Sequence, residues 1–257
     1  MKPPFPHRIK KQQLWLSPGR CVFWEEEKAL IVSDLHFGKT GHFRKSGIAV
    51  PATVYRDDLQ RLVAQIQYFQ PRQLLIVGDL FHSRENRELE LFQKWRADLP
   101  DLAFRLIKGN HDILHDDWYA AAGIELSEKK LRIGEFLFMH DIGDLTHPDL
   151  DTAVCDTGLS DTPLSDSPGA TPNPTPVDPS PADLSPTDGY VFSGHIHPGI
   201  RINGVAKQAL QFPCFYFGGA HAILPAFSRF TGMVSIYPKP DENVFAIIQY
   251  DSILQIQ

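Results

Sequence analysis

Residues 29–36 read Ala-Leu-Ile-Val-Ser-Asp-Leu-His, a short apolar run that leads directly into an acidic side chain and an imidazole. Similar runs, each followed by acidic, amide or imidazole side chains, return along the chain at 74–79, 104–112, 136–140 and 190–197. Short apolar runs of this kind are typical of buried strands. Side chains that follow the carboxyl ends of several strands in an α/β sheet can meet in one crevice. The sequence therefore predicts an α/β fold with a polar site at the ends of its strands.

The side chains at these strand ends share one kind of chemistry. They are carboxylates, imidazoles and one amide: Asp34, His36, Asp79, Asn110, His111, Asp112, His140, His195 and His197. Nitrogen and oxygen donors together suit manganese, iron, zinc or nickel, whereas calcium prefers oxygen alone. A lone Asp or His after a strand is more often a turn or capping residue. The ordered set, rather than any single block, predicts a two-metal hydrolytic site.

The blocks Asp-x-His, Gly-Asp, Gly-Asn-His-Asp, His and Gly-His-x-His, in this order, resemble the pattern of the calcineurin-like metallophosphoesterases. The resemblance implies a four-layer α/β/β/α sandwich, in which helices flank two packed mixed sheets. It also implies two divalent metal ions. One would be held by Asp34, His36, Asp79 and His197, and the other by Asp79, Asn110, His140 and His195. Asp79 would then bridge the two ions, which lie roughly 3.5–4 Å apart in two-metal sites.

The same resemblance implies roles for residues outside the ligand set. His111 would lie near the phosphoryl group and donate a hydrogen bond or a proton toward the leaving oxygen. Asp112 would hold the other ring nitrogen of His111, and the alternative is that it caps a helix. The cations nearest in sequence to the metal-bearing loops are Lys39, Arg44 and Arg84, and they are candidates for holding flanking phosphates of a substrate.

Further stretches resemble the bacterial DNA ligase-associated metallophosphoesterases. These stretches are Asp34 to Lys39 with Phe43-Arg44 and Gly47-Ile48, Phe212 to Gly218, and Leu224 to Phe227 with Phe230-Thr231-Gly232. The resemblance implies a manganese-dependent phosphodiesterase that acts as a single-stranded DNA endonuclease in DNA repair, in association with a DNA ligase and a helicase. Iron, zinc, nickel or magnesium would be alternatives to manganese. Gly78-Asp79 is followed by Leu80-Phe81-His82, without the Asp-Arg-Gly that phosphoprotein phosphatases carry there.

Two other functions stay open at this point. The first is a small-molecule phosphodiesterase or phosphatase, acting on a cyclic nucleotide or a nucleotide-linked metabolite. The second is a metal-bound scaffold for a DNA ligase or helicase partner. A complete set of ligands argues against the scaffold, since a scaffold has no need of every ligand.

Composition favours one domain over residues 1–257. The chain is 42% hydrophobic and 22% charged, as in ordinary soluble globular proteins. No apolar run approaches the ~20 residues that a membrane span needs. The basic start of the chain is not followed by the apolar stretch of a secretory signal. The chain has three Cys, an odd number, so a disulfide framework is not expected. A cytoplasmic location is expected instead.

The segment at about 144–188 differs from the rest in composition. It is rich in Asp, Pro, Ser and Thr and poor in large apolar residues, so a disordered insertion is expected. A lid or a partner-binding arm is the functional alternative. From 133 to 200 there is no Lys or Arg, whereas the other residues carry 25 basic against 20 acidic side chains, a formal charge of +5. A mildly basic body is compatible with a polyanionic substrate such as nucleic acid.

Apolar spacing also predicts the elements around the motif. A hairpin is expected at 21–24 and 29–32, and helices at 54–69, 84–97 and 116–122. Beyond Gly204 the pattern changes to strands at 209–217, 222–224, 233–237 and 244–249. These later strands are expected to form a second sheet that packs against the first.

Overall fold

The structure is a computed structural model, and it describes residues 2–38, 53–81, 87–145, 189–203, 209–249 and 251–256. Almost all of the insertion predicted at about 144–188 lies outside these residues. Lys39, Arg44 and Arg84, the predicted substrate-binding residues, lie outside them as well.

The first sheet combines an antiparallel and a parallel half. Its strands are, in spatial order, β1 (Phe5–Ile9), β2 (Gln12–Ser17), β3 (Cys21–Trp24), β4 (Ala29–Ser33), β5 (Gln73–Val77), β6 (Ala103–Ile107) and β7 (Ile124–Ser127). The predicted hairpin is confirmed, since β3 pairs antiparallel with β4. From β4 to β7 the pairs are parallel. Parallel neighbours need crossover connections. They contain α2 (Thr53–Phe69), α3 (Arg87–Ala97) and α4 (Asp116–Ala121).

The second sheet contains more of the chain than its expected strands. It holds β8 (Lys130–Ile133), β9 (Phe136–Met139), β10 (Tyr190–Ser193), β11 (Pro198–Asn203), β12 (Ala209–Phe217), β13 (His221–Ile223), β14 (Val234–Ser235), β15 (Asn243–Ile248) and β16 (Ser252–Gln255). The strands expected after Gly204 are confirmed as part of it. However, β9 and β10 pair parallel with each other in this sheet, so the ligands that follow them come from the second sheet and not from the first.

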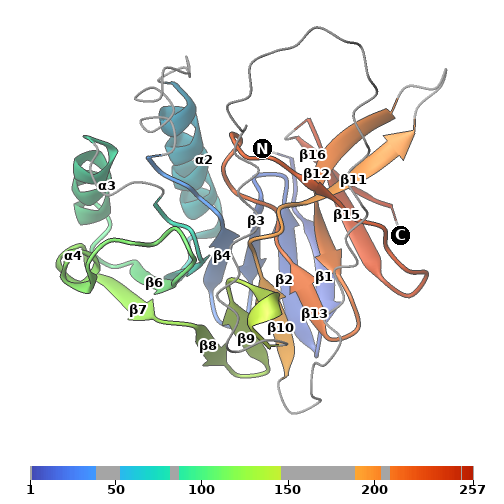
Figure 1. Ribbon diagram of the computed structural model, residues 1–257, viewed down its shortest axis with the longest axis horizontal. Coiled ribbons are helices and arrows are strands. Elements are labelled where there is room, and N and C mark those ends of the chain that lie inside the picture. Colours follow the sequence, from blue (N-terminus) through green and yellow to red (C-terminus); the bar gives the residue numbers. More distant parts are fainter. Residues whose placement is uncertain are drawn as a thin grey trace, which may run out of the picture.

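Figure 1 shows the strands of both sheets, and a core of large aromatic side chains joins the two sheets. Trp24 and Ile31 of the first sheet pack with Phe136 and Phe192 of the second, and all four are at most 1% exposed. The rings of Trp24 and Phe136 are 4.6 Å apart between centroids. Burial of each such side chain stabilises the fold by about 1.5–3 kcal/mol. This core therefore fixes the position of one sheet on the other.

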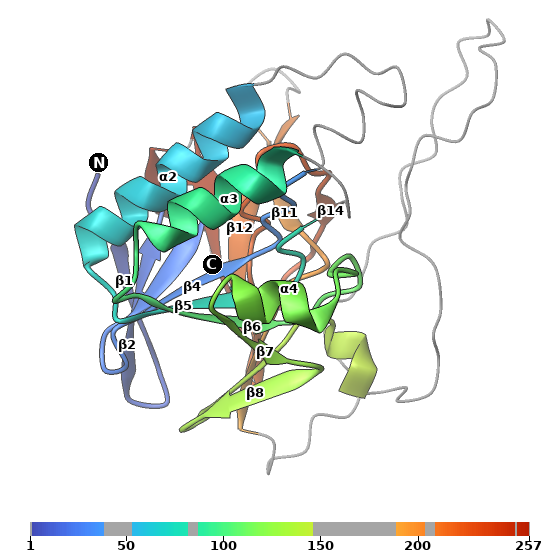
Figure 2. The same ribbon diagram turned by 90° about the vertical axis from the view of Figure 1, so that its left-hand side faces the viewer.

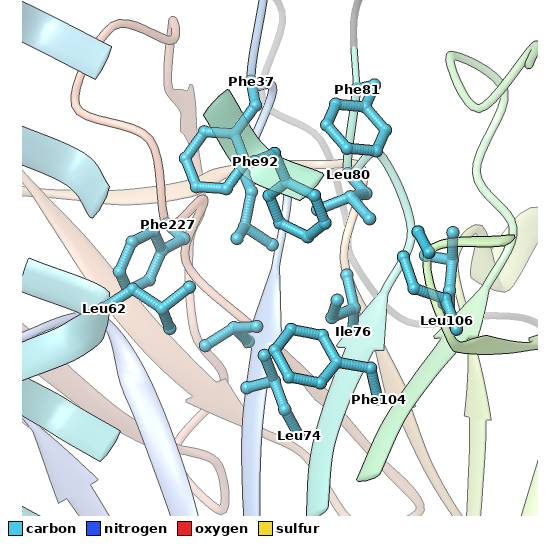
Figure 3. Close-up of a cluster of buried hydrophobic side chains, with 14 of the residues drawn as sticks. Phe37, Leu62, Leu74, Ile76, Leu80, Phe81, Phe92, Phe104, Leu106 and Phe227 are labelled. Carbon is cyan, nitrogen blue, oxygen red and sulfur yellow. The ribbon is translucent and has the colours of Figure 1, made fainter. Parts of the chain in front are cut away.

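The opposite face of the first sheet is covered by the helices (Figure 2). Phe92 of α3 contacts Phe81 and Phe104, with ring centroids 5.0 and 6.4 Å apart (Figure 3). Leu62 of α2 lies in the same cluster. The expected α/β class, with two mixed sheets and flanking helices, is confirmed.

The outer face of the second sheet carries a shorter element. Among the described residues it has the 3-10 turn η1 (Ile142–Leu145), whose Ile142 packs with Leu137, Met139 and Val191. Within the described ranges, no helix is long and apolar enough to cross a membrane.

One half-buried imidazole outside the strand-end cluster gives the fold a pH dependence. The ring of His7 on β1 lies 4.3 Å from that of Phe217 and 5.0 Å from that of Phe245, between centroids. Burial lowers the pKa of His7 from 6.5 to about 4. Because the unfolded chain takes up this proton first, stability falls as the pH drops from 6.5 to about 4 and is constant below.

His7→Phe is expected to flatten this acid-side loss of stability. After allowing for solvent screening of a partly exposed ring, the wild type should lose about 1–2 kcal/mol more than the variant between pH 7 and pH 4.5. Urea unfolding of both proteins at the two pH values measures the difference. Identical losses in the two proteins would mean that His7 titrates normally in the folded state.

Candidate metal centre

The five predicted segments meet where strands of both sheets end. Asp34 and His36 follow β4, and Asp79 follows β5, its parallel neighbour in the first sheet. His140 follows β9, and His195 follows β10, its parallel neighbour in the second. Backbone hydrogen bonds tie these ends together: Gly194 N donates to His140 O at 3.0 Å, and Asp34 N donates to Gly78 O at 3.2 Å. The site is thus built across the interface of the two sheets.

Asp34, His36 and His197 form one group of converging donors. Each offers one atom, and these atoms lie within 4.8 Å of one another. His197 Nε2 is 3.2 Å from Asp34 Oδ1 and 3.5 Å from His36 Nε2. These three residues belong to the ligand set predicted for the first metal.

Asp34, Asp79 and His140 form a second group of the same kind. His140 Nε2 lies 3.4 Å from Asp79 Oδ2, and His140 Nδ1 lies 3.9 Å from Asp34 Oδ1. The same Asp79 oxygen is 3.8 Å from His36 Nε2, so it reaches an imidazole of each predicted ligand set. Asp34 is shared by both groups, and both carboxylates therefore have the position that a bridging ligand needs.

The surroundings of His140 test whether a cation fits. Its Nδ1 lies 3.1 Å from the Val77 carbonyl, which can only accept a hydrogen bond, so Nδ1 carries the proton. Its Nε2 faces Asn110 Oδ1 at 3.2 Å, His195 Nδ1 at 3.3 Å and Asp79 Oδ2 at 3.4 Å. Burial opposes protonation of this ring, but Asp79 and Asp34 raise the pKa of His140 to about 10, so Nε2 holds a proton where a metal ion would take its place. The donor set and the fixed tautomer both fit a divalent transition metal.

Electrostatics hold the cluster in its charged form. Burial of Asp34 opposes its ionisation, but His197 and His140 hold its pKa down to about 2. Burial likewise opposes ionisation of Asp79, and His140 and His36 hold its pKa well below the usual range. Two buried carboxylates are therefore ionised at neutral pH, and buried charges of this kind are normally paired or bound to metals.

The backbone at the ligands is strained. Asp34, His36, Asp79, His195 and His197 all have positive φ, between 48° and 65°. Such a conformation costs of order 1–3 kcal/mol per non-glycine residue and persists where the surrounding structure imposes it. The ligands in the Asp-x-His and Gly-His-x-His blocks are two residues apart, and their left-handed backbone lies just beyond the ends of β4 and β10, where it changes the direction of the chain at the site.

Two glycines allow the cluster to close. Gly78 has a φ of 77°, and the His140 ring occupies the space that a Cβ there would take. At Gly194 a Cβ would meet the Ser33 hydroxyl and the Asp34 carboxylate. Ser33 is a residue that the sequence analysis missed as part of the site: its Oγ lies 2.8 Å from the Val77 carbonyl and in short contact with the Asp34 carboxylate. A hydroxyl that ends an otherwise apolar strand was the available signal.

His111 lies beside the cluster. Its backbone N–H donates to Asp79 Oδ1 at 3.0 Å, and its ring centroid is 5.5 Å from that of His36. The half-buried ring therefore borders the converging donors, while the main chain holds the Asp79 carboxylate.

Asp112 holds two loops together. Its Oδ1 accepts hydrogen bonds from Leu80 N at 2.9 Å and Phe81 N at 3.2 Å, and its Oδ2 accepts one from Gly109 N at 3.0 Å. The alternative that Asp112 caps a helix is wrong, because the N-cap of α4 is His115. Orientation of the His111 ring by Asp112 stays a prediction.

The chain is similar to one known family and to solved structures. A family model described as "Calcineurin-like phosphoesterase" matches residues 28–199. The crystal structure of Pseudomonas putida nuclease MPE is similar at 25% identity and a TM-score of 0.67, over 95% of this chain and 96% of that one. The phosphoesterase Yfce from E. coli aligns at 12% identity and a TM-score of 0.38, over 89% and 97% of the two chains. A search of curated protein sequences gave no significant match.

Proposed function

The chain belongs to the calcineurin-like phosphoesterase family and is a metal-dependent phosphoester hydrolase, and on this premise we propose that it is a manganese-dependent endonuclease of single-stranded DNA. The observation that carries the choice of substrate is the similarity to a nuclease along nearly the whole length of both chains. Action in DNA repair beside a DNA ligase and a helicase, in the cytoplasm, is part of the same proposal.

We assign the predicted ligands to two metals. Asp34, His36, Asp79 and His197 would hold one ion, Asp79, Asn110, His140 and His195 would hold the other, and Asp79 would belong to both sets. The reach of Asp79 Oδ2 to both His36 and His140 supports this assignment. The mixture of imidazole and carboxylate donors is compatible with manganese, as it is with iron, zinc or nickel. When bound, the two ions supply a nucleophile at neutral pH and neutralise charge on the phosphate.

The protein's own side chains carry the other parts of the reaction. His111 borders the donors from one side, where it donates a hydrogen bond or a proton toward the leaving oxygen. Asp112 holds the loops of Asp79 and His111 in register through three backbone N–H groups. Lys39, Arg44 and Arg84 are proposed to hold phosphates that flank the scissile bond.

The test is hydrolysis of circular single-stranded DNA by metal-stripped protein to which Mn²⁺ is added back. The small diester bis-(p-nitrophenyl) phosphate is assayed in parallel. Linear products from the circles are expected, because only cleavage within a strand opens a circle. Cleavage of the small diester alone would move the substrate to a cyclic nucleotide or a nucleotide-linked metabolite. If neither the DNA circle nor the small diester is hydrolysed, the fold is a metal-bound scaffold and not an enzyme.

A further inference from the structure

The loop after β13 carries main-chain hydrogen bonds to the end of β4. This segment, residues 224–229, begins at the second sheet, where Leu224 N donates to Ser193 O at 2.8 Å. It then reaches the first sheet, where Phe227 N donates to Ser33 O at 2.7 Å and Ser228 N donates to Asp34 O at 3.1 Å. These two bonds hold the residue pair in which β4 ends and the backbone turns to the left-handed conformation of Asp34.

Three buried charged side chains form hydrogen bonds with the main chain of the 224–229 loop. Arg20 is 5% exposed, and its Nη1 donates to Ala226 O at 2.9 Å and to Ser228 O at 2.6 Å. Arg61 of α2 donates to Phe227 O in a short contact, and its guanidinium lies 4.2 Å from the centre of the Phe227 ring.

The third side chain completes the set. Asp58, 2% exposed, forms an ion pair with Arg61 at 2.8 Å and accepts a hydrogen bond from Arg229 N at 3.3 Å. Each residue from 226 to 229 thus has one backbone group bonded to a buried charge. The Phe227 side chain is also anchored in the helix-side core (Figure 3).

Holding a loop with buried charges has a large cost in desolvation free energy. Removing an ion from water costs several kcal/mol, and apolar contacts of similar volume often stabilise a fold as well or better. What charge-assisted hydrogen bonds add is directional precision at the carbonyls that they bind. That precision is useful here because the same residues donate to Ser33 and Asp34, and the Asp34 carboxylate lies in both groups of converging donors.

We propose that Arg20, Asp58 and Arg61 are positioning residues for the metal centre. They fix the carbonyls of residues 226–228, the loop fixes the main chain of Ser33 and Asp34, and this places the Asp34 carboxylate among its imidazole partners. The inference rests on the proposed metal centre and extends it to residues outside the motif blocks, in the turn between β2 and β3 and on α2.

The experiment measures Mn²⁺ binding and not only turnover. Metal-stripped full-length wild type, Arg20→Gln, Arg20→Lys and Asp58→Asn are titrated with Mn²⁺ in a calorimeter, and their thermal unfolding is recorded. Arg20→Gln and Asp58→Asn are expected to weaken Mn²⁺ binding by about 10–100-fold, the usual effect of removing an outer partner of a ligand. Activity lost at limiting Mn²⁺ should return at saturating Mn²⁺, and Arg20→Lys should lie between the wild type and Arg20→Gln.

Arg105→Gln is the matched control. It removes a guanidinium from a partly exposed ion pair with Glu125 on β6 and β7, and its Mn²⁺ affinity should equal that of the wild type. If Arg20→Gln does not fold, Arg20→Lys, which keeps the charge, is compared with the wild type for Mn²⁺ affinity instead. Folded variants with a lower melting temperature but unchanged Mn²⁺ affinity would overturn the inference and leave a purely structural role. A wild type that binds no Mn²⁺ would instead overturn the proposed metal centre itself.

Discussion

Replacement of Asp79 with Asn is expected to remove both Mn²⁺ binding and turnover, with a loss of at least ~10³ in kcat/KM, or about 4 kcal/mol of transition-state stabilisation. The reason lies in the position of one oxygen. Asp79 Oδ2 is 3.4 Å from His140 Nε2 and 3.8 Å from His36 Nε2, so it is shared between the two ligand sets. An amide keeps one oxygen but loses the negative charge, and it cannot neutralise two cations.

The measurement pairs metal content after dialysis with hydrolysis of the DNA circle and of the small diester. Asp98→Asn, the same chemical change on an exposed residue, is the control and should behave as the wild type. Full metal content and activity in Asp79→Asn would falsify the bridging assignment. Asp34→Asn decides between the two carboxylates, because Asp34 is common to both groups of donors. If Asp34→Asn loses both ions and Asp79→Asn loses one, Asp34 is the bridge.

Local spacing was sufficient to predict most of the elements. The helix expected at 54–69 is α2 (Thr53–Phe69), because its apolar residues recur at the helical period and form one buried face. The strand expected at 209–217 is β12, with the same bounds. Each of these signals lies within a few residues of sequence, where propensity and periodicity act.

Sheet membership could not be predicted in the same way. The run Phe136–Met139 looks like the runs at β4 and β5, yet it pairs with β10 across the long segment that separates them. Which strands pair depends on side chains far apart in sequence, such as the rings of Trp24 and Phe136. The N-terminal strands β1 and β2 were missed as well. β1 alternates intermediate and exposed residues and has little apolar signal.

The site shows the same division. The motif blocks predicted side chains that converge, because each block is a local pattern of at most four residues. The left-handed backbone at Asp34 and His195, and the contact of Gly194 with Ser33, depend on two sheets meeting. Arg20 and Ala226 are 206 residues apart in sequence, so no spacing rule could have linked them.

Replacement of His111 with Ala is expected to keep both metals and to lower kcat on DNA by about 10²–10⁴-fold, the usual contribution of a positioned general acid. Metal binding should survive because the contact with Asp79 is made by the backbone N–H of residue 111, which Ala retains. The ring, which borders His36, is what the variant loses.

A comparison of two leaving groups shows whether the His111 ring protonates the leaving oxygen or contacts a non-bridging oxygen of the phosphate. A p-nitrophenolate departs readily without a proton, whereas the sugar oxygen of DNA does not, so protonation by His111 predicts a much smaller loss on bis-(p-nitrophenyl) phosphate than on DNA. Equal losses on both substrates would place the ring on a non-bridging phosphoryl oxygen, where its charge stabilises every transition state alike. Loss of Mn²⁺ from the variant would contradict both roles and make His111 part of the metal centre, since general acid catalysis requires a ring that leaves the ligands in place.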